Sequence, residues 1–305
     1  MKRREFVKAG GALVSLGLLM NKTTPLAAAE AATHDVEYQE AQAEADAALS
    51  KYVDLARFEE GWVNAGSHRM HFKFNRLLRD TGTKVILVHG LGLSYRYMLP
   101  TAQALMDEYD VYAPDLPGFG DSDKPDTVLD MNGLGDSLAA WLRATKLRGR
   151  LALLGNSMGC QIIAAALERH PAVAHAAVLQ GPITPPDERG VFIQFVRWRQ
   201  NVRNNPPEMK PISRADYMKC GYRRVWRTFL LSLDDRMEDR LPRIAQPTLV
   251  VRGERDPICN DAWARQVTEL LPRGKLVHIP RVAHTLVIIS PRELAEVATR
   301  FLKDV

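Results

Sequence analysis

Cysteine is scarce in this chain of 305 residues, which contains three cysteines, at positions 160, 220 and 259. An odd and widely scattered set does not make a disulfide framework, and its spacing is not that of a zinc site. We therefore favour three buried free thiols over a disulfide pair. No other group of residues has the spacing of metal ligands, so we expect no metal centre.

Long apolar runs are also missing. The uncharged stretch from Ala9 to Met20 is 12 residues long, fewer than the roughly 20 that a membrane-spanning helix needs. It follows a basic head, Met1 to Lys8, and precedes Ala27-Ala28-Ala29. This order of segments predicts an export signal over residues 1–29 and no stable membrane anchor. The alternatives are an N-terminal amphipathic helix or an uncleaved anchor.

The head of this segment resembles a twin-arginine signal, because Arg3 and Arg4 begin the order Arg-Arg-x-Phe-Val-Lys. Such a signal sends out proteins that have already folded. The resemblance implies a periplasmic or secreted protein whose partner during transport is the twin-arginine export machinery.

An excess of charge of one sign disappears once this segment is set aside. The whole chain has a net charge of +5, but residues 1–29 hold five of its 41 Lys+Arg and one of its 36 Asp+Glu. The remainder has 36 basic and 35 acidic residues. The charge therefore gives no reason to expect a nucleic-acid partner.

Most of the chain alternates between short apolar runs and helical segments. After an Ala/Glu-rich helical lead-in over residues 30–56, a β-hairpin is expected around Asn64-Ala65-Gly66-Ser67. Strand-like runs then alternate with helical segments, which predicts an α/β fold with a mostly parallel central sheet flanked by helices. The expected strands cover residues 85–88, 110–113, 151–154, 174–179, 248–251 and 275–279, and the expected helices 100–108, 132–146, 161–167, 261–271 and 291–302.

One segment breaks this alternation. Residues 182–244 contain no strand-like run but many prolines, aromatics and arginines. We interpret the segment as a helical cap inserted into a core of residues 57–181 and 245–305, over the carboxyl ends of the strands, where ligands bind in α/β sheets. Phe192, Trp198 and Trp226 are candidates for lining a substrate pocket; the alternative is that these aromatics form the small core of the cap itself.

A serine stands where the strand at residues 151–154 turns into a helix, in Gly155-Asn156-Ser157-Met158-Gly159. Glycines two residues before and two after the serine are typical of a nucleophile elbow, which lifts the hydroxyl above a helix N-terminus. An acyl-transfer serine also needs N–H donors for the developing oxyanion. The candidates are the N–H groups of Met158 and of Leu91 in the loop His89-Gly90-Leu91-Gly92, whose Gly90 is expected to face the substrate.

Two further strand ends carry the groups that a nucleophilic serine needs. Asp256 follows the strand at residues 248–251, and His284 follows the strand at residues 275–279. His284 would take the proton of Ser157, and Asp256 would orient the imidazole. Glu254 is the competing acid, and we favour Asp256.

Two other polar residues at strand ends have simpler interpretations. His89 is interpreted as a buried structural residue rather than a base. Asp115, which follows the strand at residues 110–113, is interpreted as a turn-forming carboxylate.

Together these motifs closely resemble the α/β-hydrolases that carry a cap domain. The resemblance rests on His-Gly-Leu-Gly, Pro-Asp-Leu-Pro-Gly-Phe-Gly-Asp-Ser, Gly-Asn-Ser-Met-Gly, Gly-Glu-Arg-Asp-Pro and Val-Ala-His, which occur in family order over residues 57–305. The elbow is similar to those of carboxylesterases and of meta-cleavage-product hydrolases, which break carbon–carbon bonds. A serine at this position differs from the aspartate of haloalkane dehalogenases and epoxide hydrolases.

The resemblance implies a serine hydrolase with a small-molecule substrate and no cofactor. An ester of a small-to-medium apolar acid is the expected substrate, because the cap is rich in aromatics. The alternatives are carbon–carbon bond or lactone hydrolysis with the same three residues, and a hydrolase fold that binds a ligand without catalysis.

Overall fold

An eight-stranded sheet is the central feature of the computed structural model, which describes residues 25–76 and 82–305. The predicted export signal over 1–29 lies outside the described residues except for its last five. The chain divides into two units, Met1–Glu40 and Ala41–Val305, and the sheet, the cap and the candidate site all belong to the second. The helical lead-in predicted for residues 30–56 falls on α2 (Pro25–Leu49) and a short 3₁₀ turn, η2 (Leu55–Arg57).

The strands are arranged in the order β1-β2-β4-β3-β5-β6-β7-β8. The pairs β1–β2 and β2–β4 are antiparallel, and all other pairs, including β4–β3, are parallel. β1 and β2 form the hairpin predicted at Gly66, and the parallel strands confirm the predicted α/β fold. The strands are β1 (Glu59–Ala65), β2 (His68–Asn75), β3 (Thr83–Val88), β4 (Asp110–Pro114), β5 (Arg150–Asn156), β6 (Ala176–Gln180), β7 (Thr248–Gly253) and β8 (Gly274–Ile279).

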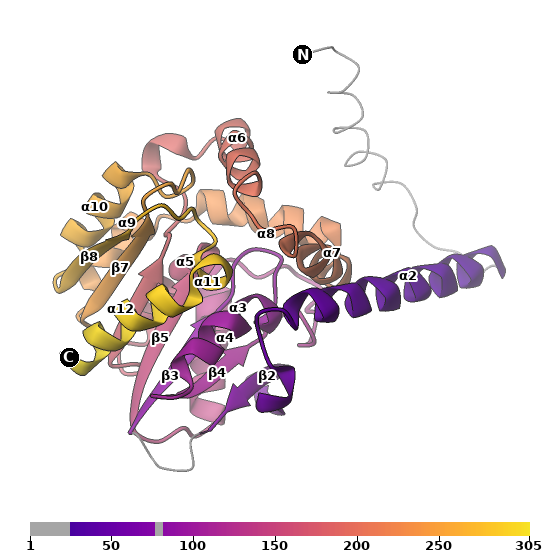
Figure 1. Ribbon diagram of the computed structural model, residues 1–305, viewed down its shortest axis with the longest axis horizontal. Helices are drawn as coiled ribbons and strands as arrows, with labels where there is room; N and C mark the ends of the chain where they lie inside the picture. The colour runs from indigo at the N-terminus through magenta and orange to yellow at the C-terminus, as the bar shows by residue number, and fades with distance from the viewer. Residues whose placement is uncertain (1–24, 77–81) are drawn as a thin grey trace. The chain divides into compact units, whose positions relative to one another are not determined.

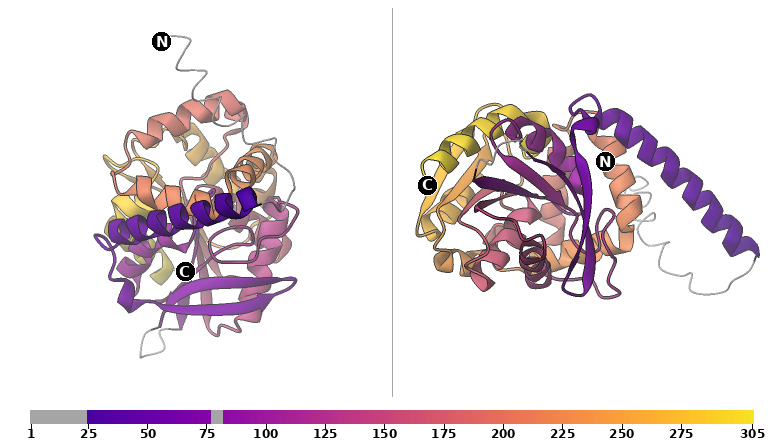
Figure 2. Two further views of the ribbon diagram at one scale, coloured as in Figure 1. Left: turned by 90° about the vertical axis from the view of Figure 1, so that its right-hand side faces the viewer. Right: turned by 90° about the horizontal axis from the view of Figure 1, so that it is seen from below.

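Two layers of helices cover the sheet (Figures 1 and 2). Successive side chains of a strand point to opposite faces, so in β3 Val85 and Leu87 join one buried cluster while Ile86 and Val88 join the other. The first cluster packs against α3 (Tyr95–Leu105), α11 (Leu286–Ile289) and α12 (Pro291–Lys303), and the second against α4 (Met131–Ala144), α5 (Met158–Arg169) and α10 (Asp261–Leu270). Burial on both faces explains why the parallel strands read as continuous apolar runs.

α3 begins earlier than the sequence suggested. We expected a helix over residues 100–108, which starts with a proline. Instead the side chain of Ser94 accepts a hydrogen bond from the N–H of Arg96 and caps the helix, and Pro100 lies inside it. The predicted start was therefore wrong, because a serine cap outweighed the proline signal.

Between β6 and β7 the structure contains helices and no strand, as expected for residues 182–244, and their role as a cap stays a prediction. Most of these elements lie toward one end of the sheet, while residues 237–240 lie beside α5 (Figure 1). The elements are η3 (Pro186–Glu188), α6 (Val191–Val202), α7 (Met209–Cys220), α8 (Tyr222–Asp234), α9 (Met237–Arg240) and η4 (Leu241–Arg243). Within residues 25–76 and 82–305, no helix is both long enough and apolar enough to cross a bilayer.

Candidate active site

Ser157 lies at the turn between β5 and α5, as the nucleophile-elbow pattern predicts. Its backbone has φ 59° and ψ −123°, a region that a non-glycine residue rarely adopts. The flanking glycines make this turn possible. A Cβ at Gly155 would lie 2.8 Å from the main chain of Gly159, and a Cβ at Gly159 would collide with the carbonyl of Val88. The elbow therefore needs both glycines, and it holds the serine in a strained conformation above the start of α5.

His284 and Asp256 form a buried pair. Nδ1 of His284 lies 2.8 Å from Oδ2 of Asp256, and both side chains are nearly inaccessible to solvent. Oδ1 of Asp256 accepts the N–H groups of Ile258 at 2.8 Å and Cys259 at 2.9 Å. These bonds fix the carboxyl group in place, and its second oxygen accepts the imidazole N–H, which favours the tautomer with its proton on Nδ1. Nε2 of His284 is then free of its proton, and it has no hydrogen-bond partner among the described residues.

Main-chain and amide contacts connect this pair to the serine. The N–H of Ser157 donates to the carbonyl of Gln180 at 3.0 Å. The side-chain amide of Gln180 donates to the carbonyl of His284 at 3.0 Å, and Nδ2 of Asn156 lies 3.4 Å from the same carbonyl. The histidine loop is thus attached to residues that flank Ser157. No hydrogen bond joins the Ser157 hydroxyl to Nε2 in the described structure, and such bonds often tighten only when substrate is bound.

The loop after β3 lies next to the serine. A Cβ added to Gly90 would lie 3.4 Å from Cβ of Ser157, which is van der Waals contact. Met158 is the first residue of α5, and its N–H therefore has no acceptor within the helix. These positions are compatible with the oxyanion role predicted for the N–H groups of Leu91 and Met158 and with the substrate contact predicted for Gly90. All three roles stay predictions.

The ring of His89 is hydrogen-bonded to the main chain of this loop and of a neighbouring turn. Its Nδ1 donates to the carbonyl of Gly90 at 2.9 Å, and its Nε2 accepts the N–H of Leu116 at 3.1 Å. Burial lowers the pKa of His89 below its ordinary value, because desolvation disfavours the charged ring. A neutral imidazole with both nitrogens in use has a structural role, which agrees with the interpretation from the sequence.

The aromatic candidates lie on the surface of the cap. Phe192 is 73% exposed, Trp198 44% and Trp226 42%. The structure does not bring them together with His284, Asp256 or Ser157, so their role in lining a pocket stays a prediction.

One cluster of described residues has the composition of a metal site. Ligand atoms of His71, Asp115 and Asp121 lie within 4.8 Å of one another. However, Asp115 already accepts the His71 ring at 2.8 Å and the N–H groups of Tyr95 and Asp121, and Asp121 pairs with Lys219. Protein donors satisfy these carboxylates, so the cluster does not fit a cation. Asp115 closes the turn up to Asp121, as the sequence suggested.

All three cysteines are buried free thiols, which confirms the prediction. Burial raises the pKa of Cys160 and Cys259 well above the ordinary value, because the thiolate would be desolvated. These thiols are therefore not activated as nucleophiles.

Several supporting residues escaped sequence analysis. Arg252 is buried and donates to the carbonyls of Cys259 at 2.7 Å, Glu254 at 3.1 Å and Asp256 at 3.2 Å, which fixes the loop that carries the acid. Gln180 and Gly181 support the histidine from the end of β6. Their position at the carboxyl end of a buried strand was the one available signal, because residues at these strand ends tend to surround the ligand site.

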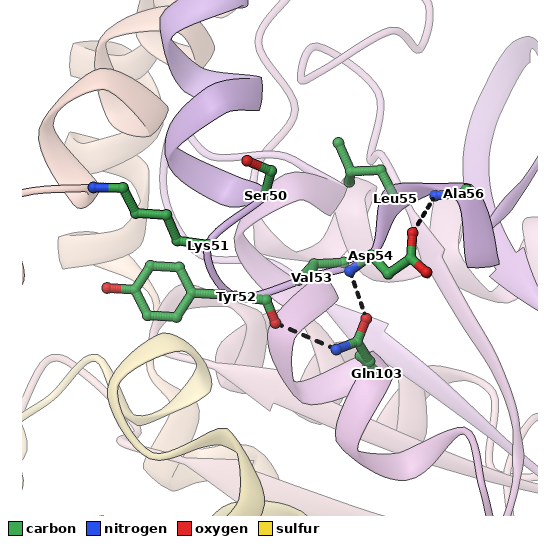
Figure 3. A pocket seen from close by; sticks show the side chains of 8 residues that line it. All are labelled: Ser50, Lys51, Tyr52, Val53, Asp54, Leu55, Ala56 and Gln103. Carbon is green, nitrogen blue, oxygen red and sulfur yellow. Dashed lines mark hydrogen bonds between the residues drawn. The ribbon is translucent and has the colours of Figure 1, made fainter.

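A pocket elsewhere in the second unit does not involve the candidate site (Figure 3). Gln103 of α3 reaches into it, accepts the N–H of Asp54 at 2.7 Å and donates to the carbonyl of Tyr52 at 3.3 Å. These bonds satisfy the turn after α2, so we interpret the pocket as structural. Its lining residues are Ser50, Lys51, Tyr52, Val53, Asp54, Leu55, Ala56 and Gln103.

Comparison with known proteins agrees with the fold. Residues 85–297 match the model of the alpha/beta hydrolase family. The chain belongs to this family and is a hydrolase.

Its relatives act on different bonds. The chain is 22% identical to the 2-hydroxy-6-oxo-6-(2'-aminophenyl)hexa-2,4-dienoic acid hydrolase of Metapseudomonas resinovorans, over 80% of this chain and 91% of that protein. It is 24% identical to Lipase 3 of a Moraxella species, over 70% and 76%. It is 29% identical to a haloalkane dehalogenase of Mycobacterium marinum, over 76% and 83%.

Solved structures show the same fold. The crystal structure of a membrane phospholipase A matches with a TM-score of 0.70 at 24% identity, over 92% of this chain and 96% of that one. An esterase from Thermogutta terrifontis matches with a TM-score of 0.68 at 22% identity, over 81% and 98%. At these identities the likeness concerns the fold.

Proposed function

We propose that this protein is a serine hydrolase that cleaves an ester of a small-to-medium apolar acid through an acyl-enzyme. The observation that carries the proposal is the buried 2.8 Å contact between His284 and Asp256, because it leaves the unpartnered Nε2 as a base. The histidine loop is held by Gln180 and Asn156, next to Ser157. These contacts support a serine–histidine–aspartate triad, in which the imidazole would reach the serine hydroxyl once substrate is bound.

The proposed reaction has two stages. His284 takes the hydroxyl proton of Ser157 while the serine oxygen attacks the carbonyl carbon of the ester. The resulting oxyanion is held by the N–H groups of Leu91 and Met158, and His284 then gives the proton to the departing alcohol. Water, activated by the same imidazole, attacks the acyl-enzyme and releases the acid. Asp256 keeps the imidazole oriented and stabilises its positive form.

The choice of an ester rests on the presence of lipases and an esterase among the similar proteins. The aromatic content of the cap adds no support, because Phe192, Trp198 and Trp226 are exposed. Removal of halide is not proposed, although a haloalkane dehalogenase is a relative. Dehalogenases use an aspartate where this chain has Ser157.

Hydrolysis of a carbon–carbon bond is the second candidate. One relative is named for a dienoic acid substrate of this kind and is covered by this chain over 91% of its length. The same three residues would act, with water or the serine attacking a ketone carbonyl. Lactone hydrolysis is a variant of the ester reaction in which the acid and the alcohol stay joined.

Labelling by a fluorophosphonate probe tests the proposal. The wild-type protein is expected to react and Ser157→Ala to show no labelling, while both keep the same circular dichroism. If well-folded wild type is not labelled, the proposal fails and a ligand-binding role takes its place. Turnover of p-nitrophenyl esters of increasing acyl length, measured beside a lactone and a vinylogous diketone, then separates the ester, lactone and carbon–carbon activities.

We also propose that the protein is exported through the twin-arginine machinery to the periplasm or beyond. The support is the order of residues from Arg3 to Lys8 and the Ala-x-Ala end of the segment. Replacing Arg3 and Arg4 by lysine is expected to abolish export in the native host. Unchanged export of the double variant would show that another route is used.

A further inference from the structure

Helix α6 of the cap buries polar side chains and exposes apolar ones. Surface helices normally turn an apolar stripe toward the core. In α6 the buried side chains are Gln194 and Asn201. The half-exposed apolar residues recur at helical spacing and form one stripe that borders the buried polar side chains, with exposed fractions between 41% and 47%; they are Val191, Phe195, Trp198 and Val202.

Helix α8 also buries polar side chains and exposes aromatic ones. Thr228 and Ser232, four residues apart, are fully buried. Tyr222 and Trp226, also four residues apart, are 47% and 42% exposed. Two helices of one cap thus expose aromatic rings and bury hydroxyl or amide groups, although α8 also buries Leu233. The exposed rings are therefore a property of the cap and not of one residue.

These exposed residues define what we call the cap aromatic surface. Among the described residues, nine large apolar side chains are exposed, and seven of them lie on α6 or α8; the seven are Val191, Phe192, Phe195, Trp198, Val202, Tyr222 and Trp226. Single exposed apolar residues are ordinary, but a concentration on two helices indicates a surface that binds a partner.

Charge on the same helices indicates the chemistry of that partner. From the first residue of α6 to the last of α8, residues 191–234, there are nine Lys+Arg and three Asp+Glu. Outside this segment and residues 1–29, the chain has 27 basic and 32 acidic residues. These helices therefore carry a basic excess that the rest of the sequence after residue 29 lacks, and two of their three acids are already bound. Glu208 pairs with Lys51, and Asp216 accepts hydrogen bonds from Ser94.

Four exposed arginines stand directly beside the apolar stripes. Each follows an exposed apolar residue in sequence, in the pairs Trp198-Arg199, Val202-Arg203, Tyr222-Arg223 and Trp226-Arg227. Within each helix the two arginines are four residues apart and so lie on one side. None of the four has an ion-pair partner in the part of the chain that the structure describes. Unpaired cations beside an apolar stripe complement a surface that is apolar inside and negatively charged outside.

We propose that the cap aromatic surface binds the surface of an anionic lipid bilayer. Aromatic and aliphatic side chains enter the boundary between headgroups and acyl chains, and the adjacent arginines contact the lipid phosphates. Aliphatic Val191 and Val202 in the stripe favour hydrocarbon over nucleic acid, since base stacking requires rings. The mixture of tryptophan with arginine is typical of helices that lie in the interface.

Binding to vesicles is the first test, made with the full chain. Vesicles of phosphatidylglycerol and phosphatidylcholine are expected to bind it more tightly than vesicles of phosphatidylcholine alone, and added salt is expected to weaken the binding. Replacing Phe195 and Trp198 by serine is expected to weaken binding about tenfold or more. The matched control is Trp62→Ser, which removes an exposed tryptophan from β1 and should leave binding unchanged.

A second variant tests the charges. Glutamine in place of Arg199, Arg203, Arg223 and Arg227 is expected to remove the preference for anionic lipid. Glutamine in place of Arg292 and Arg300, which are exposed on α12, should preserve it.

Quenching by brominated lipid shows which part of the chain enters the bilayer. The protein has five tryptophans, of which Trp141 and Trp263 are buried, and residues 1–24 contain none. With the wild type, brominated anionic vesicles are expected to quench part of the emission. The double variant Trp198→Phe and Trp226→Phe keeps an apolar surface and should still bind, but the quenching should be lost.

Four outcomes overturn the proposal. The first is no binding to anionic vesicles at low ionic strength. The second is binding that the serine and glutamine variants leave unchanged, which would locate it elsewhere. The third is a dimer that the Phe195 and Trp198 variant dissociates, because the partner would then be a second copy. The fourth is a raised KM of the Phe195 and Trp198 serine variant for a soluble ester, with its vesicle binding unchanged. The stripe would then be a wall of the substrate pocket.

Discussion

The side-chain amide of Gln180 holds the main-chain carbonyl of His284 at 3.0 Å, while the carbonyl of the same glutamine accepts the N–H of Ser157 at 3.0 Å. One residue at the end of β6 thus touches the backbone of both the proposed nucleophile and the proposed base. Gln180 is fully buried, and its Oε1 accepts the amide of Asn156. A fixed glutamine therefore sets how the loop of His284 sits relative to the elbow.

Gln180→Leu should lower turnover more than substrate binding. Leucine keeps the volume but leaves the carbonyl of His284 and the amide of Asn156 without their partner, so the imidazole loses its fixed position. We expect kcat for an ester to fall about tenfold with KM nearly unchanged, and stability to fall by about 1–3 kcal/mol. The control is Gln246→Leu, which removes another buried glutamine bonded to a carbonyl, that of Pro171. An equal fall of kcat in the control would mean that general destabilisation explains the loss.

Asp256→Asn tests which acid orients His284. Asparagine can offer its N–H₂ to the imidazole and so favour the wrong tautomer, which makes a fall in kcat of about 10³–10⁴-fold the expectation for a triad aspartate. Glu254 is the matched control, since its carboxylate accepts the N–H of Arg281 at 2.9 Å and does not contact His284. Glu254→Gln should therefore retain most activity. A reversed pattern in steady-state kinetics would assign the acid to Glu254.

The elements around the site could be predicted from the sequence because each carries a strong local signal. β5 and β7 are buried on both faces and so appear as unbroken apolar runs. The elbow at Ser157 has its flanking glycines, and Asp256 and His284 follow strands that pair as neighbours in the sheet. Local pattern and chain order were sufficient in these cases, because parallel strands bring their carboxyl ends to one edge.

The supporting contacts could not be predicted, because they depend on register between distant segments. Gln180 meets His284 across 104 residues of sequence, and Arg252 is buried by loops whose course no local pattern reveals. The outward direction of Phe192 and Trp198 was equally hidden. Aromatic content indicates that rings must pack somewhere, but which side of a helix faces the core is decided by the tertiary structure.

Asp216 makes stability depend on pH. Burial raises the pKa of its carboxyl to about 7, although Arg96 and two hydrogen bonds from Ser94 favour the anion, and nearby Asp115 adds to the rise. In the unfolded chain the carboxyl titrates near its ordinary value of 3.8. Between pH 4 and pH 7 the folded state therefore holds a proton that the unfolded state releases, so the free energy of unfolding falls as pH rises, by on the order of 1 kcal/mol per pH unit.

Urea unfolding of wild type and Asp216→Asn across this range measures the effect. Asparagine carries no titrating proton, so the difference in unfolding free energy between the two proteins should change from pH 4 to pH 7 and become constant above it. Groups common to both proteins cancel in this difference. A constant difference across the range would mean that Asp216 is ionised in the folded protein and that the ion pair with Arg96 dominates.

Gly181→Ala should disturb the base and its acid directly. A Cβ at this position would lie 2.9 Å from Nδ1 of His284 and 3.1 Å from Oδ2 of Asp256, closer than side chains normally approach. The φ of Gly181 is +60°, so alanine adds a backbone cost of about 1–2 kcal/mol. Gly221→Ala separates the two effects, because Gly221 has φ +87° and nothing within 4 Å of the added atom. We expect both variants to lose stability in urea, Gly181→Ala the more because of its clash. Only Gly181→Ala should lose tenfold or more in kcat, since only there must the imidazole move. Equal activities of the two variants at matched folded fraction would show that the pair of His284 and Asp256 tolerates displacement and does not limit turnover.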